Sequence, residues 1–180
     1  MVGTIHVAPQ GTPYPRPQAE YHATAAAERG SLLGQGLGLE VDGLIQALLG
    51  GPSQVTTGTG RQLPGTGNVF VARFEPDRRA VKVGQTVTWT DRDPAVPHTV
   101  TFGPEPPGGL LGLVAPSGAV DRTGHATLNA PGQAANSGVI GVGQPLGTTF
   151  SATFTAPGTY SYICGLHDTL GMKGTISVVP

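Results

Sequence analysis

The sequence contains a single cysteine, Cys164, among its 180 residues. One thiol cannot form an intramolecular disulfide, and it cannot supply the two bridging thiolates of a binuclear metal centre. The role of Cys164 is therefore that of a metal ligand, a nucleophile or a buried small side chain.

Charged residues and long apolar runs are also scarce. Only 12% of the residues are charged, and the formal net charge is −1. The absence of a basic patch argues against nucleic-acid binding. The sequence also has no run of about 18 apolar residues, which is the length that would predict a transmembrane segment. Glycine (29 residues) and proline (17 residues) are abundant, while alternating apolar stretches indicate a folded β domain with long loops.

Three side chains that bind soft metals lie within nine positions near the C-terminus. Cys164, His167 and Met172 fall between segments 159–163 and 173–179, which both alternate in the manner of β-strands. Two intervening residues let a tight loop turn the thiol and imidazole toward one point, and four more bring the thioether to a third side. One thiolate, two imidazoles and a distant thioether are the ligands of electron-transfer copper sites. The loop lacks the second histidine.

Of the five histidines, His98 is the best placed to complete this set. It follows the proline-containing turn 91–97 and begins a segment with strand character. By contrast, His125 has no second donor nearby, which predicts a surface histidine. The predicted ligands of one type 1 copper ion are His98, Cys164, His167 and Met172.

Residues 66–180 resemble the cupredoxins, the blue-copper family that includes plastocyanin, pseudoazurin, auracyanin and halocyanin. The resemblance rests on the Pro-His-Thr-Val segment 97–100, on segment 157–164 and on the Cys-x2-His-x4-Met loop. It implies an all-β, Greek-key β-sandwich or barrel with Trp89 in its core. By the same resemblance, electrons pass to partners through His167.

Thr99 departs from the asparagine that many cupredoxins carry after the first histidine ligand. Its hydroxyl is still able to hydrogen-bond between the two ligand segments and so to affect the thiolate. The sequence is compatible with more than one hydrogen-bond partner for this hydroxyl.

The first nine residues repeat the pattern of the last nine, with Met, Gly, Thr, Ile, Val and Pro in register between 1–9 and 172–180. The repeat indicates the closing strand of a preceding cupredoxin domain, and hence a tandem protein. The alternative is an initiator methionine followed by a common β pattern. Segment 1–9 has no secretory signal, whereas the resemblance implies a periplasmic or extracellular location, or the outer face of the cell membrane.

Residues 10–65 are predicted to form a helical, Gly/Pro-rich N-terminal extension and a linker. Segment 18–29 is rich in helix formers and is expected to end at Gly30, and segment 37–49 has apolar residues at helical spacing. We expect these helices to cover a barrel end or an interdomain seam, since a membrane-surface anchor usually carries more Lys and Arg. Segment 53–67, rich in Ser, Thr and Gly, is predicted to be a linker.

The region from 103 to 147 is the least regular part of the predicted β domain. It begins with an apolar group that we expect to pack within the loop, a docking surface being the alternative: Leu110, Leu111, Leu113 and Val114.

The ligand set predicts an electron carrier that cycles between Cu(I) and Cu(II) and exchanges single electrons with redox partner proteins. A ligand cage fixed by a β-sandwich suits both oxidation states, so little reorganisation accompanies transfer. Ile163 and Gly165 flank Cys164, and neither relays electrons to a second copper, so the chain is predicted not to be an enzyme. Copper storage or delivery, or a structural cupredoxin module of a larger assembly or multidomain copper enzyme, are the alternatives.

Overall fold

The computed structural model describes residues 5, 7–13, 15–64 and 67–180, which separate into two compact units, Met1–Gly34 and Gln35–Pro180. The predicted closing strand at 1–9 lies largely outside the described residues. Its described members, Ile5 and residues 7–9, belong to no strand. The assignment of this segment to a preceding domain stays a prediction.

One helix, α1 (Gln18–Leu49), takes the place of the two predicted helices. The prediction of a helix end at Gly30 was wrong, because Gly30 continues the helix and lacks the positive φ of a helix-terminating glycine. A glycine inside a helix costs about 1 kcal/mol relative to alanine. With no proline after it, this cost alone does not end the helix.

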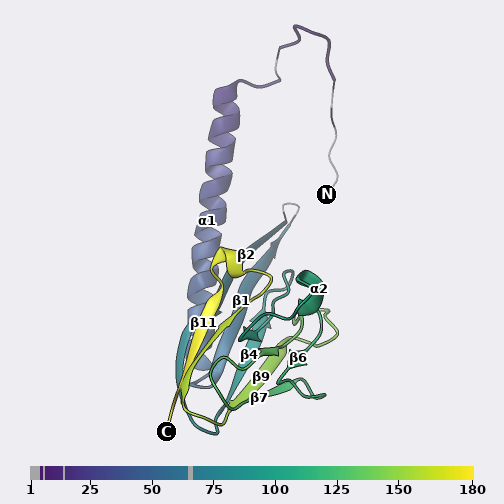
Figure 1. Ribbon diagram of the computed structural model, residues 1–180. Coiled ribbons are helices and arrows are strands. Elements are labelled where there is room, and N and C mark those ends of the chain that lie inside the picture. Colours follow the sequence, from purple (N-terminus) through teal and green to yellow (C-terminus); the bar gives the residue numbers. More distant parts are fainter. Residues whose placement is uncertain (1–4, 6, 14, 65–66) are drawn as a thin grey trace. The chain divides into compact units, whose positions relative to one another are not determined.

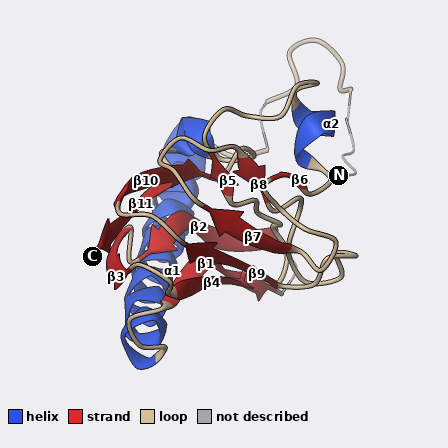
Figure 2. Cartoon of the chain, turned by 60° about the horizontal axis from the view of Figure 1, so that its bottom comes forward, coloured by secondary structure: helices blue, strands red, loops and turns tan. Residues whose placement is uncertain are grey.

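The β domain consists of two sheets (Figure 1). The first has the strand order β2-β1-β4-β9-β7 and contains β1 (Gln54–Leu63), β2 (Gly67–Glu75), β4 (Thr86–Arg92), β7 (His125–Leu128) and β9 (Thr149–Phe154). The second has the order β3-β11-β10-β5-β8-β6 and contains β3 (Arg78–Lys82), β5 (Thr101–Phe102), β6 (Ser117–Gly118), β8 (Ala135–Asn136), β10 (Gly158–Ile163) and β11 (Lys173–Val179). Figure 2 shows both sheets with their strands labelled. The predicted all-β sandwich is confirmed, and within the described residues its two sheets do not close into a barrel.

The core between the sheets is built around Trp89, which is fully buried as predicted. Its indole meets the rings of Phe102, Phe150 and Tyr162 at centroid distances of 5.6, 5.8 and 5.2 Å. Such tilted and edge-on contacts add specificity to the burial of apolar area. Cys164 and Met172 belong to the same buried cluster, so two of the predicted ligands are part of the core.

Strand β1 corrects the prediction that residues 53–67 form a linker. It pairs antiparallel with β2 and parallel with β4, and therefore lies inside the sheet. Val55 and Thr57 are buried, and the register shifts between Thr57 and Thr59, around Gly58. Threonine favours strands, so the high Ser, Thr and Gly content was compatible with a bulged β-strand as well as with a loop.

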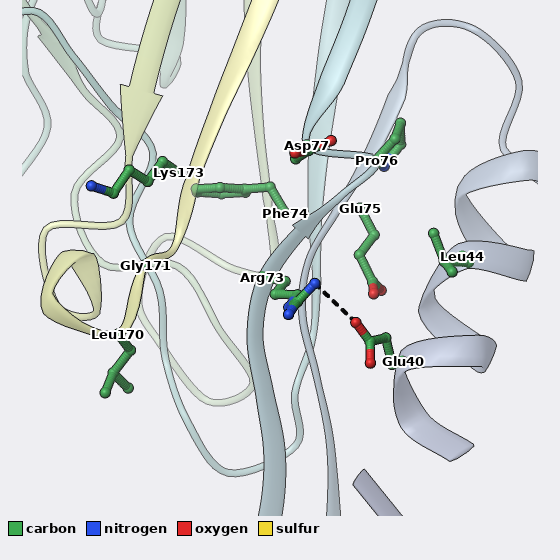
Figure 3. A pocket seen from close by; sticks show the side chains of 10 residues that line it. All are labelled: Glu40, Leu44, Arg73, Phe74, Glu75, Pro76, Asp77, Leu170, Gly171 and Lys173. Atoms are coloured by element: carbon green, nitrogen blue, oxygen red, sulfur yellow. Dashed lines mark ion pairs between the residues drawn. The ribbon is translucent and has the colours of Figure 1, made fainter. Parts of the chain in front are cut away.

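The C-terminal half of α1 packs on the β domain through Leu39, Gly43 and Ala47, which are buried. Arg79 fixes this end of the helix, since its Nη2 donates to the Ala47 carbonyl at 2.7 Å. Figure 3 shows the ion pair between Glu40 of the helix and Arg73 of β2, with an N–O distance of 2.9 Å. This half of the helix therefore covers one part of the β domain. Among the described residues, no helix is both long and apolar enough to span a membrane.

The region from 103 to 147 is more regular than predicted, because it contains α2 (Leu110–Leu113), β6, β7 and β8. His125 begins β7 and is half-buried, with ring nitrogens 2.8 Å from Ser151 Oγ and 3.0 Å from Thr153 Oγ1. The prediction of a plain surface histidine was therefore incomplete. Leu113 packs inward as expected, but three neighbours are exposed: Leu110, Leu111 and Val114.

Candidate metal centre

The sheets hold the two ligand-bearing segments by their ends. Cys164 directly follows β10, and Met172 directly precedes β11, with Ile163 paired to Lys173 across the two strands. The loop between them is closed by the Cys164 N–H, which donates to the Met172 carbonyl at 3.1 Å. His98 lies before β5 and exchanges backbone hydrogen bonds with Ile140, both at 2.9 Å. These backbone hydrogen bonds restrict the movement of both ligand-bearing segments.

Three donor atoms converge at one point. Cys164 Sγ lies 3.7 Å from His98 Nδ1 and 3.4 Å from His167 Nδ1, and the two Nδ1 atoms are 3.2 Å apart. The circle through three atoms with these separations has a radius of about 2 Å, which is the length of metal–nitrogen and nearly that of metal–thiolate bonds. The three residues also form a group able to hold a metal ion. Their spacing fits a trigonal site for one small ion.

Met172 lies beside this triangle. Its side chain is fully buried, and its backbone N–H donates to the His167 carbonyl at 3.3 Å. The short 3₁₀ helix η1 (Asp168–Leu170) makes this return of the chain possible, ending at Gly171 with a φ of 85°. The structure thus brings together the segments that carry all four predicted ligands. A thioether and a thiolate beside two imidazoles are ligands that favour copper.

Burial sets the protonation of the metal-free site. It lowers the pKa of His98 to about 3, with a further contribution from the neighbouring His167. It also lowers the pKa of His167, although the Asp93 carboxylate opposes this shift. Burial raises the pKa of the Cys164 thiol, against hydrogen bonds such as that from Thr99. Near neutral pH both imidazoles offer lone pairs, and metal binding releases the thiol proton.

Thr99 joins the two ligand segments. Its backbone N–H points at Cys164 Sγ, 3.3 Å away, and its hydroxyl accepts a hydrogen bond from the Gly165 N–H at 2.8 Å. The hydroxyl also lies 3.3 Å from Thr101 Oγ1. The sequence indicated such a role for Thr99, and the structure defines its partners.

Two residues near the site were missed at the level of sequence, both on the β1–β2 hairpin. Gly58 has a φ of +68° and lies against the His98 imidazole, where a Cβ would overlap Nε2. The Phe70 ring lies 5.8 Å from that of His167, centroid to centroid. The available signal was the glycine within a threonine-rich strand, which often marks a close approach of another group to the backbone.

The comparisons with known proteins agree with this geometry. The model of the family "Copper binding proteins, plastocyanin/azurin family" matches residues 65–179. Over 107 residues the chain is 36% identical to plastocyanin of Scenedesmus fuscus, covering 58% of this chain and 85% of the relative. It is 34% identical over 118 residues to chloroplastic plastocyanin of Oryza sativa subsp. indica, covering 64% of this chain and 60% of the relative.

Among solved structures, oxidised plastocyanin of Dryopteris crassirhizoma matches 70% of this chain and 99% of its own, with 22% identity and a TM-score of 0.43. The family match extends over more than half of the sequence and includes both ligand segments. The chain therefore belongs to the plastocyanin/azurin family of copper-binding proteins.

Proposed function

We propose that this protein is a one-electron carrier with a single type 1 copper ion, exchanging electrons between redox partner proteins. The ligands are His98, Cys164, His167 and Met172. The observation that carries the proposal is the convergence of two imidazole Nδ1 atoms and one thiol sulfur within 3.2 to 3.7 Å of one another. When bound, copper supplies the change of oxidation state, and the chain supplies a fixed cage for it.

Rigidity of the cage supports electron transfer more than it supports storage. The β10–β11 pairing fixes Cys164 and Met172 from both sides, and the Thr99 hydrogen bonds fix the distance to the His98 segment. His98 and Cys164 are fully buried, which keeps water away from them. Because the ligand positions are held the same for Cu(I) and Cu(II), little reorganisation accompanies electron transfer.

His167 is the proposed exit for the electron. It is the half-buried member of the donor triangle, so its ring gives a short bonded route from the site to the surface. The Phe70 ring, which is 36% exposed, lies against it. A partner protein can receive the electron by docking over His167 and Phe70, and this transfer requires no substrate pocket. The arrangement therefore fits an electron carrier and not an enzyme.

The partners are proposed to be redox proteins, and the location to be the periplasm, the extracellular space or the outer face of the cell membrane. The rice and barley relatives are chloroplastic plastocyanins, proteins that also belong to a compartment outside the cytosol. We further infer that residues 66–180 form the cupredoxin domain, with β1 of the preceding segment added to its sheet. A preceding domain remains part of the same proposal for residues 1–9.

The experiment is a visible absorption spectrum of the purified chain after addition of Cu(II). We expect an intense band near about 600 nm that bleaches with ascorbate, because thiolate-to-copper charge transfer dominates such sites. Cys164→Ser and His98→Gln are expected to lose the band. His125→Gln is the matched control, since His125 is a half-buried histidine outside the donor triangle, and it is expected to keep the band.

Bound copper without the band in the wild-type chain would contradict the carrier proposal and favour storage or delivery. The absence of any bound copper would leave a structural cupredoxin module.

A further inference from the structure

Helix α1 carries a seven-residue repeat along one face. From residue 23 to residue 48, steps of four and three residues alternate, and every position reached is apolar or glycine. The positions are Ala23, Ala27, Gly30, Gly34, Leu37, Val41, Leu44 and Leu48. A repeat of this length with mean spacing of 3.5 residues is typical of a helix that pairs with another helix.

The second half of the repeat, residues 37–48, lies outside the face of the helix that packs on the β domain. The inward face is marked by the buried Leu39, Gly43 and Ala47. The four large side chains of the repeat are 65, 55, 47 and 77% exposed, in the order Leu37, Val41, Leu44 and Leu48. Leu44, the least exposed of them, also lines the pocket that contains Arg73 and Glu75 (Figure 3). Exposed apolar side chains that follow one stripe of a helix are characteristic of an interaction surface.

The acidic residues in this part of the helix lie outside the stripe and pair with arginines of the β-strands, so the stripe itself carries no charge. Glu40 is paired with Arg73 at 2.9 Å, and Asp42 with Arg61 at 3.7 Å, both on the strands. The segment from 23 to 48 contains one basic residue, Arg29. A helix that lies on a membrane surface usually carries several Lys and Arg residues, so an apolar protein surface fits the stripe better than a lipid surface.

The two glycines of the stripe have no structural explanation within the described chain. A Cβ placed on Gly30 or Gly34 meets no described atom within 4 Å, and neither glycine has a positive φ. Glycine weakens a helix, and its benefit on a helix surface is that another helix can approach the backbone closely. The small residues occupy the first half of the stripe and the large ones the second half.

We propose that two copies of this chain pair through α1 in antiparallel orientation. Antiparallel pairing centred between residues 35 and 36 places a large residue opposite a small one in every layer. The layers are Gly34 with Leu37, Gly30 with Val41, Ala27 with Leu44 and Ala23 with Leu48. Facing positions that alternate in size fill the space between helices, whereas parallel pairing sets glycine against glycine and leaves voids.

The size of the stripe sets the expected strength of the dimer. At 1.5 Å per residue, 26 residues extend for about 39 Å, and a strip about 10 Å wide covers on the order of 400 Å². A standard stable interface buries about 800 Å² on each partner. The dimer is therefore expected to dissociate on dilution.

The first test is sedimentation equilibrium of the full, copper-loaded chain over a range of concentrations. The monomer mass is 18.2 kDa, and we expect it to double reversibly as concentration rises. Leu48→Glu is expected to weaken association at least tenfold. Leu49→Glu is the matched control, because Leu49 is equally exposed, at 77%, but lies outside the repeat, and it should associate like the wild type. Equal effects of both variants, or a wild-type monomer at all concentrations, would overturn the proposal.

The orientation is tested by disulfide formation between introduced thiols. Ala27→Cys and Leu44→Cys variants are mixed and oxidised, while the native Cys164 stays fully buried. Antiparallel pairing predicts a disulfide-linked dimer in the mixture and little in either variant alone, whereas efficient cross-linking of each variant alone would contradict it. Binding of the monomer to neutral or anionic phospholipid vesicles, with no dimer, would also overturn the proposal in favour of a lipid surface.

Discussion

The backbone N–H of Thr99 points at the sulfur of Cys164 across 3.3 Å, and this contact joins residues 65 positions apart in the chain. The Thr99 hydroxyl adds a second link by accepting from the Gly165 N–H at 2.8 Å. The two ligand segments are thus joined directly, and not only through the sheets. Hydrogen bonds around a metal-bound sulfur also tune the metal, so Thr99 is expected to act on both stability and spectrum.

We predict that Thr99→Val lowers the free energy of unfolding of the metal-free protein by about 1–3 kcal/mol, because it leaves the Gly165 N–H without its acceptor. Urea unfolding measures this change. The copper-loaded variant should also show a shifted absorption band. Thr99→Ser keeps the hydroxyl and is expected to restore most of both properties. A Thr99→Val variant as stable as the wild type, with Thr99→Ser destabilised, would mean that the methyl contacts, and not the hydrogen bond, matter at this position.

Gly58 gives a second prediction. Replacement by alanine puts a non-glycine residue at a φ of +68° and drives its Cβ into the His98 ring. The backbone strain costs about 1–2 kcal/mol, and overpacking in a buried site adds about 1–3 kcal/mol. We expect Gly58→Ala to lose stability and to bind Cu(II) more weakly, as measured by urea unfolding and by titration of the visible band.

The matched control is Gly84→Ala. Gly84 has a φ of +84°, but a Cβ there meets no described atom within 4 Å. It therefore reports the backbone strain alone, and copper affinity should be unchanged. If Gly84→Ala weakened copper binding as much as Gly58→Ala, the close approach of β1 to His98 would not be the cause.

The metal loop could be predicted from sequence because its chemistry is local. Cys164, His167 and Met172 lie within nine residues between two alternating strands, and short-range spacing alone brings them together. His98 is distant in sequence, and the turn before it and the family resemblance were needed to choose it among five histidines. The side-chain ligand assignment itself stays a prediction until copper binding is measured.

Strand β1 and the continuous α1 could not be predicted because long-range contacts decide both. Thr57 and Gly58 look like loop residues in isolation, and only pairing with β2 and β4 makes them part of a sheet. The helix passes through Gly30 at a local cost, and its C-terminal half is supported by the burial of Leu39 and Ala47. Local propensity is a weak guide where tertiary packing overrides it.

Met172 gives a third prediction, concerning the reduction potential. A weak thioether ligand stabilises Cu(II) more than Cu(I), because the more highly charged ion gains more from an added donor. Met172→Leu keeps the buried apolar volume and removes the donor, so we expect the blue band to persist and the potential to rise. Met172→Gln offers an amide oxygen and is expected to lower the potential. Potentiometric titration followed at the visible band measures both, and shifts of the same sign in the two variants would contradict the role of Met172 as a weak copper ligand.

Glu75 gives the last prediction, a pH dependence that arises where α1 meets β2. Its carboxyl group is buried beside Gly43 and the Thr59 hydroxyl. Burial, and secondarily the charge of Glu40, raise its pKa from 4.5 to about 7, while Arg73 opposes the shift. In Figure 3 the Glu75 side chain points toward the helix that carries Glu40.

A raised carboxyl pKa means that the folded state holds the proton more tightly than the unfolded state. The stabilisation that comes from the protonated Glu75 carboxyl group is complete below about pH 4.5, and it disappears as the pH rises to about 7. Glu75→Gln mimics the protonated form at every pH. We expect it to match the wild type at pH 4 and to exceed it at pH 8 by at most about 3 kcal/mol.

Urea unfolding of the metal-free wild type and variant from pH 4 to pH 8 measures this difference. The pKa of Asp91 is also raised by burial, to about 8, but Asp91 is present in both proteins and cancels when their stabilities are subtracted. Glu105→Gln, at an exposed loop position, is the control and should follow the wild type throughout. A difference between Glu75→Gln and wild type that did not change with pH would show that the pKa of Glu75 is not raised on folding, with Arg73 balancing the cost of burial.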